Sequence, residues 1–184
     1  ILITSNQNEL IALISKGDGS FATGVSYPLD TIGNQNARTI AVGDLTGDGL
    51  ADVVVGNTEQ STISLFLNAD GGRLMANSPS INIGCQPIRM QLFDINEDGR
   101  IDLIIACQNP NEIRVLRNQD SGTSTLFSAP YTHSYSVTTD QGQIPIIRAM
   151  SIGNLDSDNQ PDIAIGTDIG LRIINSPKPN QSSS

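Results

Sequence analysis

Short apolar runs separated by polar segments recur along the whole chain, with the spacing of β-strands. Ile40-Ala41-Val42 precedes a polar loop and Val53-Val54-Val55 follows it, and neither run shows the 3.6-residue period of a helix. Met90, Leu92 and the run Leu103-Ile104-Ile105 repeat this order. β-Branched residues in the runs and Gly, Asn, Asp and Ser between them are typical of strands joined by turns. The pattern predicts an all-β protein.

The predicted strands group into repeating units. Corresponding loops begin at residues 44, 94 and 154, a spacing of 50 and then 60 residues that falls in the range of propeller blades. We place the units at about 1–36, 37–84, 85–144 and 145–176, followed by a polar tail, 177–184, expected to be disordered. The first unit lacks an innermost strand and the last lacks an outer strand. The prediction is therefore a partial or half propeller of about four units, built from four-stranded antiparallel meanders.

A nine-residue polar loop occurs three times, each time between the first two predicted strands of a unit. Side-chain oxygens occupy positions 1, 3, 5 and 9, and position 7 would add a backbone carbonyl. The predicted ligands are Asp44, Thr46, Asp48, Leu50 and Asp52 in the first loop, Asp94, Asn96, Asp98, Arg100 and Asp102 in the second, and Asn154, Asp156, Asp158, Gln160 and Asp162 in the third. Ca²⁺ takes about six to eight such oxygens. We predict about three calcium ions.

The loops differ from those of helical EF-hands. An EF-hand needs an acidic ligand at position 12, where this chain has Val55, Ile105 and Ile165. The glycine at position 6 of the first two loops permits the positive φ that a tight loop requires. The third loop has Asn159 at that position and Pro161 before its last ligand. We therefore expect the third site to be the weakest.

These loops resemble the FG-GAP repeat family, the calcium-bearing blades of integrin α-subunit propellers. The family motif, close to Asp-x-Asn-x-Asp-Gly-x-x-Asp, is matched by residues 94–102 in full and by residues 44–52 with Thr46 at its third position. The resemblance covers almost the whole chain. It implies structural calcium in a non-catalytic module for adhesion or molecular recognition, located outside the cell or at its surface.

Composition excludes several other functions. The net charge of −9 disfavours nucleic-acid binding, and nine of the 19 acidic residues are predicted loop ligands. No apolar run approaches the roughly 20 residues of a membrane span, so we expect no membrane insertion. The chain has one histidine, His133, expected to be a solvated strand residue, and no nucleophile-elbow pattern. We predict that it is not an enzyme.

Three questions stay open at this level. The ligand is a protein or a glycan, and the alternative function is a carbohydrate-binding propeller or an accessory module of a secreted polysaccharide-active enzyme. The absence of Trp disfavours that alternative, because sugar sites usually need an exposed aromatic platform. Cys85 and Cys107 form either a disulfide or two small buried apolar residues. The incomplete terminal units predict self-association into a larger propeller.

Overall fold

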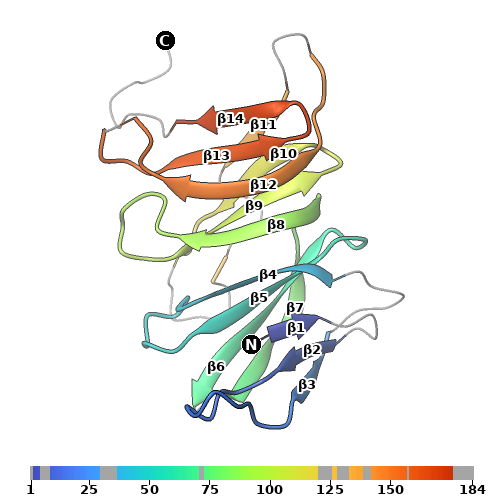
Figure 1. Cartoon of the computed structure of the whole chain (residues 1–184), viewed down its shortest axis with the longest axis vertical. Helices are drawn as coiled ribbons and strands as arrows, with labels where there is room; N and C mark the ends of the chain where they lie inside the picture. Colours follow the sequence, from blue (N-terminus) through green and yellow to red (C-terminus); the bar gives the residue numbers. More distant parts are fainter. Residues whose placement is uncertain are drawn as a thin grey trace.

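The computed structural model of the chain (Figure 1) is a stack of four antiparallel β-sheets. It describes residues 2–4, 9–29, 37–70, 73–119, 126–127, 133–138, 142–156 and 158–175, so the predicted tail lies outside the described residues. The sheets follow one another in chain order, and the stack is open rather than closed into a ring. The predicted all-β class and blade architecture are confirmed. Within the described residues, no helix has the length and apolar character needed to cross a membrane.

The first sheet contains three strands, β1 (Leu2–Thr4), β2 (Glu9–Ala12) and β3 (Val25–Pro28), in that order. Beyond the ends of β2 and β3, Ser15 and Phe21 form an isolated bridge around a turn. In that turn the Asp18 carboxylate accepts a hydrogen bond of 2.9 Å from the Ser20 amide, which stabilises the turn between β2 and β3.

The two central sheets each contain four strands in sequential order. The second sheet comprises β4 (Ala37–Gly43), β5 (Asp52–Asn57), β6 (Thr62–Asp70) and β7 (Arg73–Asn82). The third comprises β8 (Gln86–Phe93), β9 (Asp102–Gln108), β10 (Glu112–Leu116) and β11 (His133–Ser136). The outer part of the third unit falls partly outside the described residues, and the side chain of His133, expected to be solvated, is among the parts not described. The described parts include β11 and an isolated bridge between Phe127 and Asn118.

The fourth sheet contains β12 (Ile147–Gly153), β13 (Asp162–Thr167) and β14 (Gly170–Ile174). The register is the same in the last three sheets, because Val42 pairs with Val53, Leu92 with Leu103 and Ile152 with Ile163 in corresponding places. The repeated sequence pattern thus becomes a repeated strand pairing. The innermost strands are β4, β8 and β12, each at one edge of its sheet.

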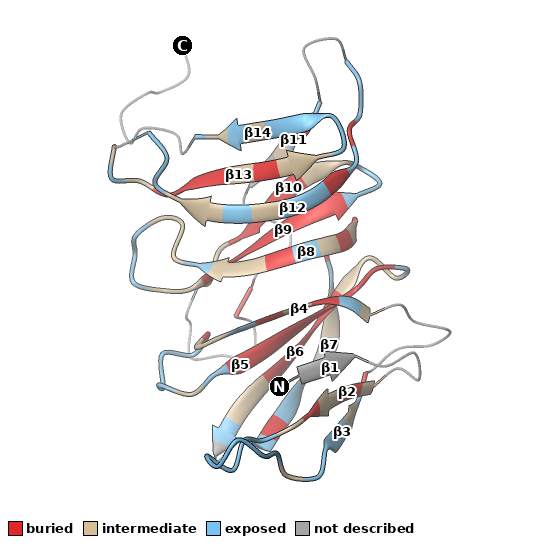
Figure 2. Ribbon diagram, in the orientation of Figure 1, coloured by how far each residue is buried: buried red, intermediate tan, exposed pale blue. Residues whose placement is uncertain are grey.

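The core consists of apolar layers between successive sheets. Along β5, Val53 and Val55 pack toward the first sheet, whereas Val54 packs toward the third. Along β9, Ile105 packs toward the second sheet and Ile104 toward the fourth. Figure 2 shows these middle strands as the most buried part of the stack. Alternate residues of one strand therefore enter different layers, as expected for strands covered on both faces.

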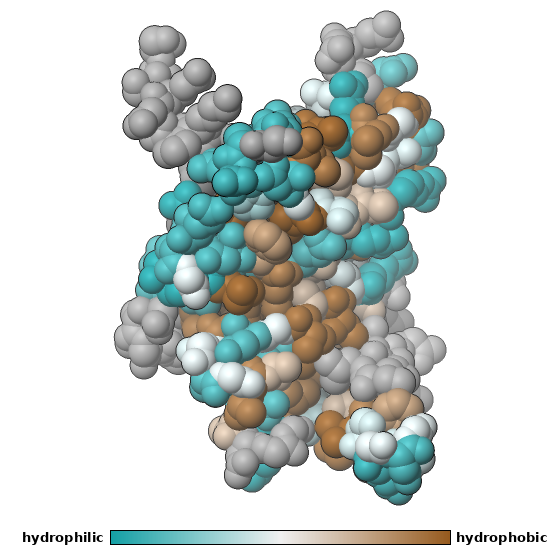
Figure 3. Space-filling view, turned by 60° about the vertical axis from the view of Figure 1, so that its left-hand side comes forward, coloured by the Kyte–Doolittle hydropathy of each residue, from teal (hydrophilic) through white to brown (hydrophobic). Residues whose placement is uncertain are grey.

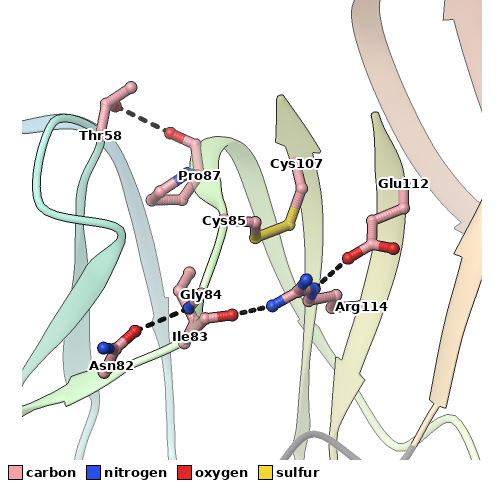
Figure 4. The surroundings of a disulfide bond; sticks show 9 residues. All are labelled: Thr58, Asn82, Ile83, Gly84, Cys85, Pro87, Cys107, Glu112 and Arg114. Carbon is pink, nitrogen blue, oxygen red and sulfur yellow. Dashed lines mark hydrogen bonds and ion pairs between the residues drawn. A yellow bond between two sulfur atoms is a disulfide. The ribbon is translucent and has the colours of Figure 1, made fainter. Parts of the chain in front are cut away.

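A disulfide joins Cys85, just before β8, to Cys107 in β9 (Figure 4). The two Cα atoms are 5.7 Å apart and both residues are fully buried. Beside the disulfide, the buried Arg114 guanidinium donates to the Glu112 carboxylate and to the carbonyl of Ile83. These contacts attach the connection between the second and third sheets to the third sheet. The choice left open by the sequence is resolved as a disulfide.

Candidate metal-binding loops

The three repeated loops lie on the same side of the stack, at the left in Figure 1. Each one connects the innermost strand of a sheet to the next strand. The residue before each loop pairs with its closing aspartate, since Gly43 pairs with Asp52, Phe93 with Asp102, and Gly153 with Asp162. Equal register at the base gives the three loops equivalent starting and ending points.

The backbone turns through positive φ at two positions of the loop. At position 6, Gly49 and Gly99 each have φ of 84°, and Asn159 has φ of 66° in the third loop. This conformation was predicted from the glycines, and Asn adopts it more readily than most residues. At position 4, Gly47 has φ of 76° and Glu97 has φ of 57°. The sequence reasoning missed position 4, where Glu97 gives no sign of a left-handed turn.

The first loop is held by carboxylates that accept hydrogen bonds from its own backbone. Asp44 Oδ1 accepts from the Gly47 amide at 2.7 Å, and its Oδ2 accepts from the Gly49 amide at 2.8 Å. Asp48 Oδ1 accepts from the Leu50 amide at 2.8 Å. Positions 1 and 5 therefore fix the turn that brings the loop back to β5.

Asp52 closes the first loop from a fully buried position. Its Oδ2 accepts a hydrogen bond of 2.9 Å from the Leu45 amide, and its Oδ1 accepts one of 2.8 Å from the Asn68 amide. Burial raises the pKa of Asp52 despite these two bonds, and the carboxylates of Asp48 and Asp44 raise it further. A positive charge in the loop would therefore stabilise the ionised form of Asp52.

The second loop differs from the first in one backbone contact, since Asp94 Oδ1 accepts from the Asp98 amide at 3.1 Å, and it has one additional cation. Asp94 Oδ2 accepts from the Gly99 amide at 2.8 Å, and Asn96 Nδ2 donates to Asp98 Oδ2 at 2.9 Å. The Arg100 guanidinium forms an ion pair with Asp98. Partial burial alone would raise the pKa of Asp98, but the hydrogen bonds from Asn96 and Arg100 and the charge of Arg100 lower it. Arg100 thus partly neutralises a predicted calcium ligand.

Asp102 closes the second loop and carries a buried oxygen without a hydrogen bond. Its Oδ1 accepts from the Asn118 amide at 2.8 Å. Its Oδ2 faces the Ile95 amide, which lowers the pKa of Asp102, but it makes no hydrogen bond of ordinary length and angle within the described part of the chain. Burial raises the pKa of Asp102, and the carboxylates of Asp98 and Asp94 add to the effect. A buried anionic oxygen in this state would be stabilised by a cation.

The third loop follows the same plan in its described residues. Asp158 Oδ1 accepts from the Gln160 amide at 2.9 Å, and Asp156 Oδ1 accepts from the Asp158 amide at 3.1 Å. The fully buried Asp162 accepts a hydrogen bond of 2.7 Å from the Leu155 amide. In the first and third loops, the closing aspartate is therefore buried and accepts a hydrogen bond from the backbone amide at loop position 2.

The remaining predicted ligands lie in the same three loops. Thr46 and Asn154 are exposed at positions 3 and 1 of their loops, and the position-7 residues are partly buried. Among the described residues, no three His, Cys, Asp or Glu side chains converge closely enough to enclose a metal ion. The loop carboxylates instead bind backbone amides. The structure therefore does not itself assemble the predicted calcium cage.

The residues nevertheless fit a hard divalent cation. Each carboxylate oxygen that accepts one amide hydrogen bond retains acceptor capacity. Every predicted side-chain ligand offers oxygen, the donor that Ca²⁺ prefers. The raised pKa values of Asp52 and Asp102 mark places where positive charge would be favourable.

Sequence reasoning also missed a residue that connects two loops. Asn118 is buried, and its side chain donates to the carbonyl of Leu45 at 2.8 Å, across the boundary between the third and second sheets. Its equivalent in the second sheet is Asn68. Val53, after Asp52, pairs with Phe66, and Asn68 lies two residues further on. Leu103, after Asp102, pairs with Leu116, and Asn118 lies two residues further on. This repeated asparagine was the signal that could have identified it.

Comparison with known protein families gives a match over three overlapping segments, residues 1–55, 44–105 and 94–165, to a family model described as an FG-GAP-like repeat. The second and third segments each begin at a candidate loop. A search of curated proteins gives no match.

Proposed function

Because the chain belongs to the FG-GAP-like repeat family, whose repeats are propeller blades, we propose that it is a calcium-binding, non-catalytic recognition module. The observation that carries this proposal is the burial of one aspartate at the end of each loop. Asp52, Asp102 and Asp162 are all fully buried at equivalent positions. Buried carboxylates are rarely retained without a compensating charge or a full set of hydrogen bonds.

The proposed role of the ion is structural. All the residues that would hold it belong to one hairpin loop, through side chains at positions 1, 3, 5 and 9 and the backbone carbonyl at position 7. The ion would supply positive charge among three acidic side chains and would hold the ends of the loop together. Binding to the folded loop alone would add to the free energy of unfolding, by about 2.7 kcal/mol when free Ca²⁺ is about 100 times the dissociation constant.

We further propose an extracellular or cell-surface location and a role in adhesion or recognition. Two observations support this location: the family match and the buried disulfide between Cys85 and Cys107. Disulfides of this kind persist in oxidising compartments and are rare in the cytosol. We favour a protein partner over a glycan, because the whole chain lacks Trp. Screening on a glycan array tests this preference, and specific glycan binding would favour the lectin-like alternative.

Calorimetric titration of chelator-treated protein with Ca²⁺ tests the metal proposal, with Mg²⁺ as a comparator. We expect about three calcium sites, with dissociation constants from micromolar to millimolar, and a calcium-dependent rise in melting temperature. Asp102→Asn should remove one site, because it removes the charge and keeps the size of the side chain. Asp18→Asn is the matched control, since Asp18 lies in a turn outside the three loops. No calcium heat and no change in melting temperature would refute the proposal.

A further inference from the structure

Asn118, two residues after the end of β10, binds the last three residues of the second loop. Its backbone amide donates to Asp102 Oδ1 at 2.8 Å, and its carbonyl oxygen accepts a hydrogen bond of 3.0 Å from Arg100 Nε. Its side-chain amide donates to the carbonyl of Ile101 at 3.2 Å. Asn118 is therefore fixed to loop positions 7, 8 and 9, of which positions 7 and 9 are predicted to supply ligands.

The same side-chain amide also reaches the first loop. Asn118 Nδ2 donates to the carbonyl oxygen of Leu45 at 2.8 Å, across the boundary between the third and second sheets. Leu45 occupies position 2 of the first loop, and its own amide donates to Asp52 Oδ2 at 2.9 Å. Asn118 and Leu45 are 2% and 3% exposed, so water hardly competes for the bond between them. Hydrogen bonds through these two residues thus join Asp102 to Asp52.

Apolar packing holds the first and second loops at the same boundary. The Leu45 side chain belongs to the apolar cluster between the second and third sheets, together with Leu103 and Leu116. Ile101 of the second loop packs against this cluster. Figure 3, in which the loop side of the stack comes forward, shows hydrophilic patches separated by apolar surface. The contacts that connect the two loops are therefore interior ones, where close packing transmits a displacement of one partner to the other.

On the basis of the calcium sites proposed above, we further propose that Asn118 is a positioning residue that makes calcium binding by the first and second loops cooperative. A cation in the second loop would fix the Asp102 carboxylate and the Arg100 carbonyl, and through them Asn118. The Asn118 side chain would then hold Leu45 in place before the first loop binds its own ion. The conformational entropy of this contact is lost only once, so the second ion binds more tightly. Linkage requires the effect to be equal in both directions.

The sequence does not repeat this asparagine between the second and third loops. Asn118 lies two residues after Leu116, and Ile174 occupies the place of Leu116 in the fourth sheet. Two residues after Ile174 the sequence has Ser176, which has no side-chain amide. The equivalent residue of the second sheet, Asn68, precedes the first loop's neighbour on the other side, a unit that lacks the loop. We therefore expect only the first and second sites to be coupled, which makes the third an internal reference.

Calorimetric titration of the full chain with Ca²⁺ tests the coupling when one or two loops are disabled. Asp48→Ala, Asp98→Ala and Asp158→Ala each remove the position-5 ligand of one loop. Asp158→Ala leaves the first and second sites, and each of these is measured alone after Asp98→Ala or Asp48→Ala is added. We expect each site to bind Ca²⁺ at least about fivefold more tightly when the other is intact. The first and third sites, measured together in Asp98→Ala, should bind independently.

Asn118→Ala should abolish this coupling, because it removes the donor to Leu45 and keeps the backbone amide that binds Asp102. The first and second sites should then have the same affinities together as alone. Asn68→Ala is the matched control, since the Asn68 side chain donates to the carbonyl of Ala51 within its own sheet. The control should leave the coupling factor unchanged. Circular dichroism establishes that each variant is folded, and the comparison of single and paired sites does not require the Asn118 variant.

Hydrogen exchange gives a readout that does not depend on filling the first site. In Asp48→Ala, Ca²⁺ bound by the second loop should slow exchange of the Leu45 amide, and adding Asn118→Ala should remove that effect. Equal affinities of the first site with and without the second would overturn the coupling, and so would coupling that survives Asn118→Ala. The absence of any calcium heat would refute the calcium proposal and the coupling together, whereas calcium binding by independent sites would refute the coupling alone.

Discussion

The side-chain amide of Asn118 donates a hydrogen bond of 2.8 Å to the carbonyl oxygen of Leu45, which belongs to a different sheet. The backbone amides of the same two residues each donate to a closing aspartate, Asn118 to Asp102 and Leu45 to Asp52. All four residues are buried. A single asparagine therefore connects the closing positions of the first and second loops across the boundary between two blades.

Replacing Asn118 with Ala should destabilise the protein by about 1–3 kcal/mol, because the buried Leu45 carbonyl loses its donor. Urea denaturation measures the change. Asn68→Ala is the matched control, since the Asn68 side chain donates to the carbonyl of Ala51 at an exposed site within its own sheet. We expect a smaller loss for the control. Equal losses of unfolding free energy in the two variants would show that the bond between sheets stabilises the protein no more than the exposed bond of Asn68 does.

Replacing Glu97 with Gly should stabilise the second loop by about 1 kcal/mol, because Glu97 has φ of 57° and carries the steric cost of the left-handed region. Thermal unfolding in chelator measures the effect without contributions from metal. Gly47→Ala, at the equivalent position of the first loop, should destabilise by a similar amount. A loss of stability in Glu97→Gly would show that position 4 does not require a left-handed residue.

Replacing Arg100 with Gln, the residue at position 7 of the third loop, should strengthen calcium binding by the second loop. The Arg100 guanidinium pairs with Asp98 and therefore competes with a bound cation. The effect should be several-fold, about 1 kcal/mol, because the pair is partly exposed to solvent. Calorimetric titration measures it, with the exposed Arg89→Gln as control. Weaker calcium binding in Arg100→Gln would contradict the prediction.

The third loop should be the weakest of the three calcium sites. Its Asn159 adopts φ of 66° at the position where the other loops have glycine, and Pro161 restricts the backbone before Asp162. The variants Asp48→Asn, Asp98→Asn and Asp158→Asn each remove the charge at position 5 of one loop. Calorimetry should show that Asp158→Asn alone removes the lowest-affinity binding step. Loss of the highest-affinity step in that variant would reverse the expected order.

Local features of the sequence determined much of the fold. Runs such as Val53-Val54-Val55 specify strands buried on both faces, because alternate side chains of a strand point to opposite sides. The glycines Gly49 and Gly99 indicated a turn with positive φ, which both adopt. The repeated loop also located the aspartates that close each hairpin. These inferences depend on interactions between residues that are near one another in the chain.

Only the tertiary structure decided which residues meet between units. No sequence pattern places Asn118 beside Leu45, which lies 73 residues away in the chain, and two states were open for Cys85 and Cys107. Nor does any pattern distinguish the exposed Leu171 from the equivalent, buried Ile63, since both occupy the same place in the repeat. The difference depends on whether another sheet packs against that face. Such packing is a property of the assembled blades, which no pattern within a single repeat records.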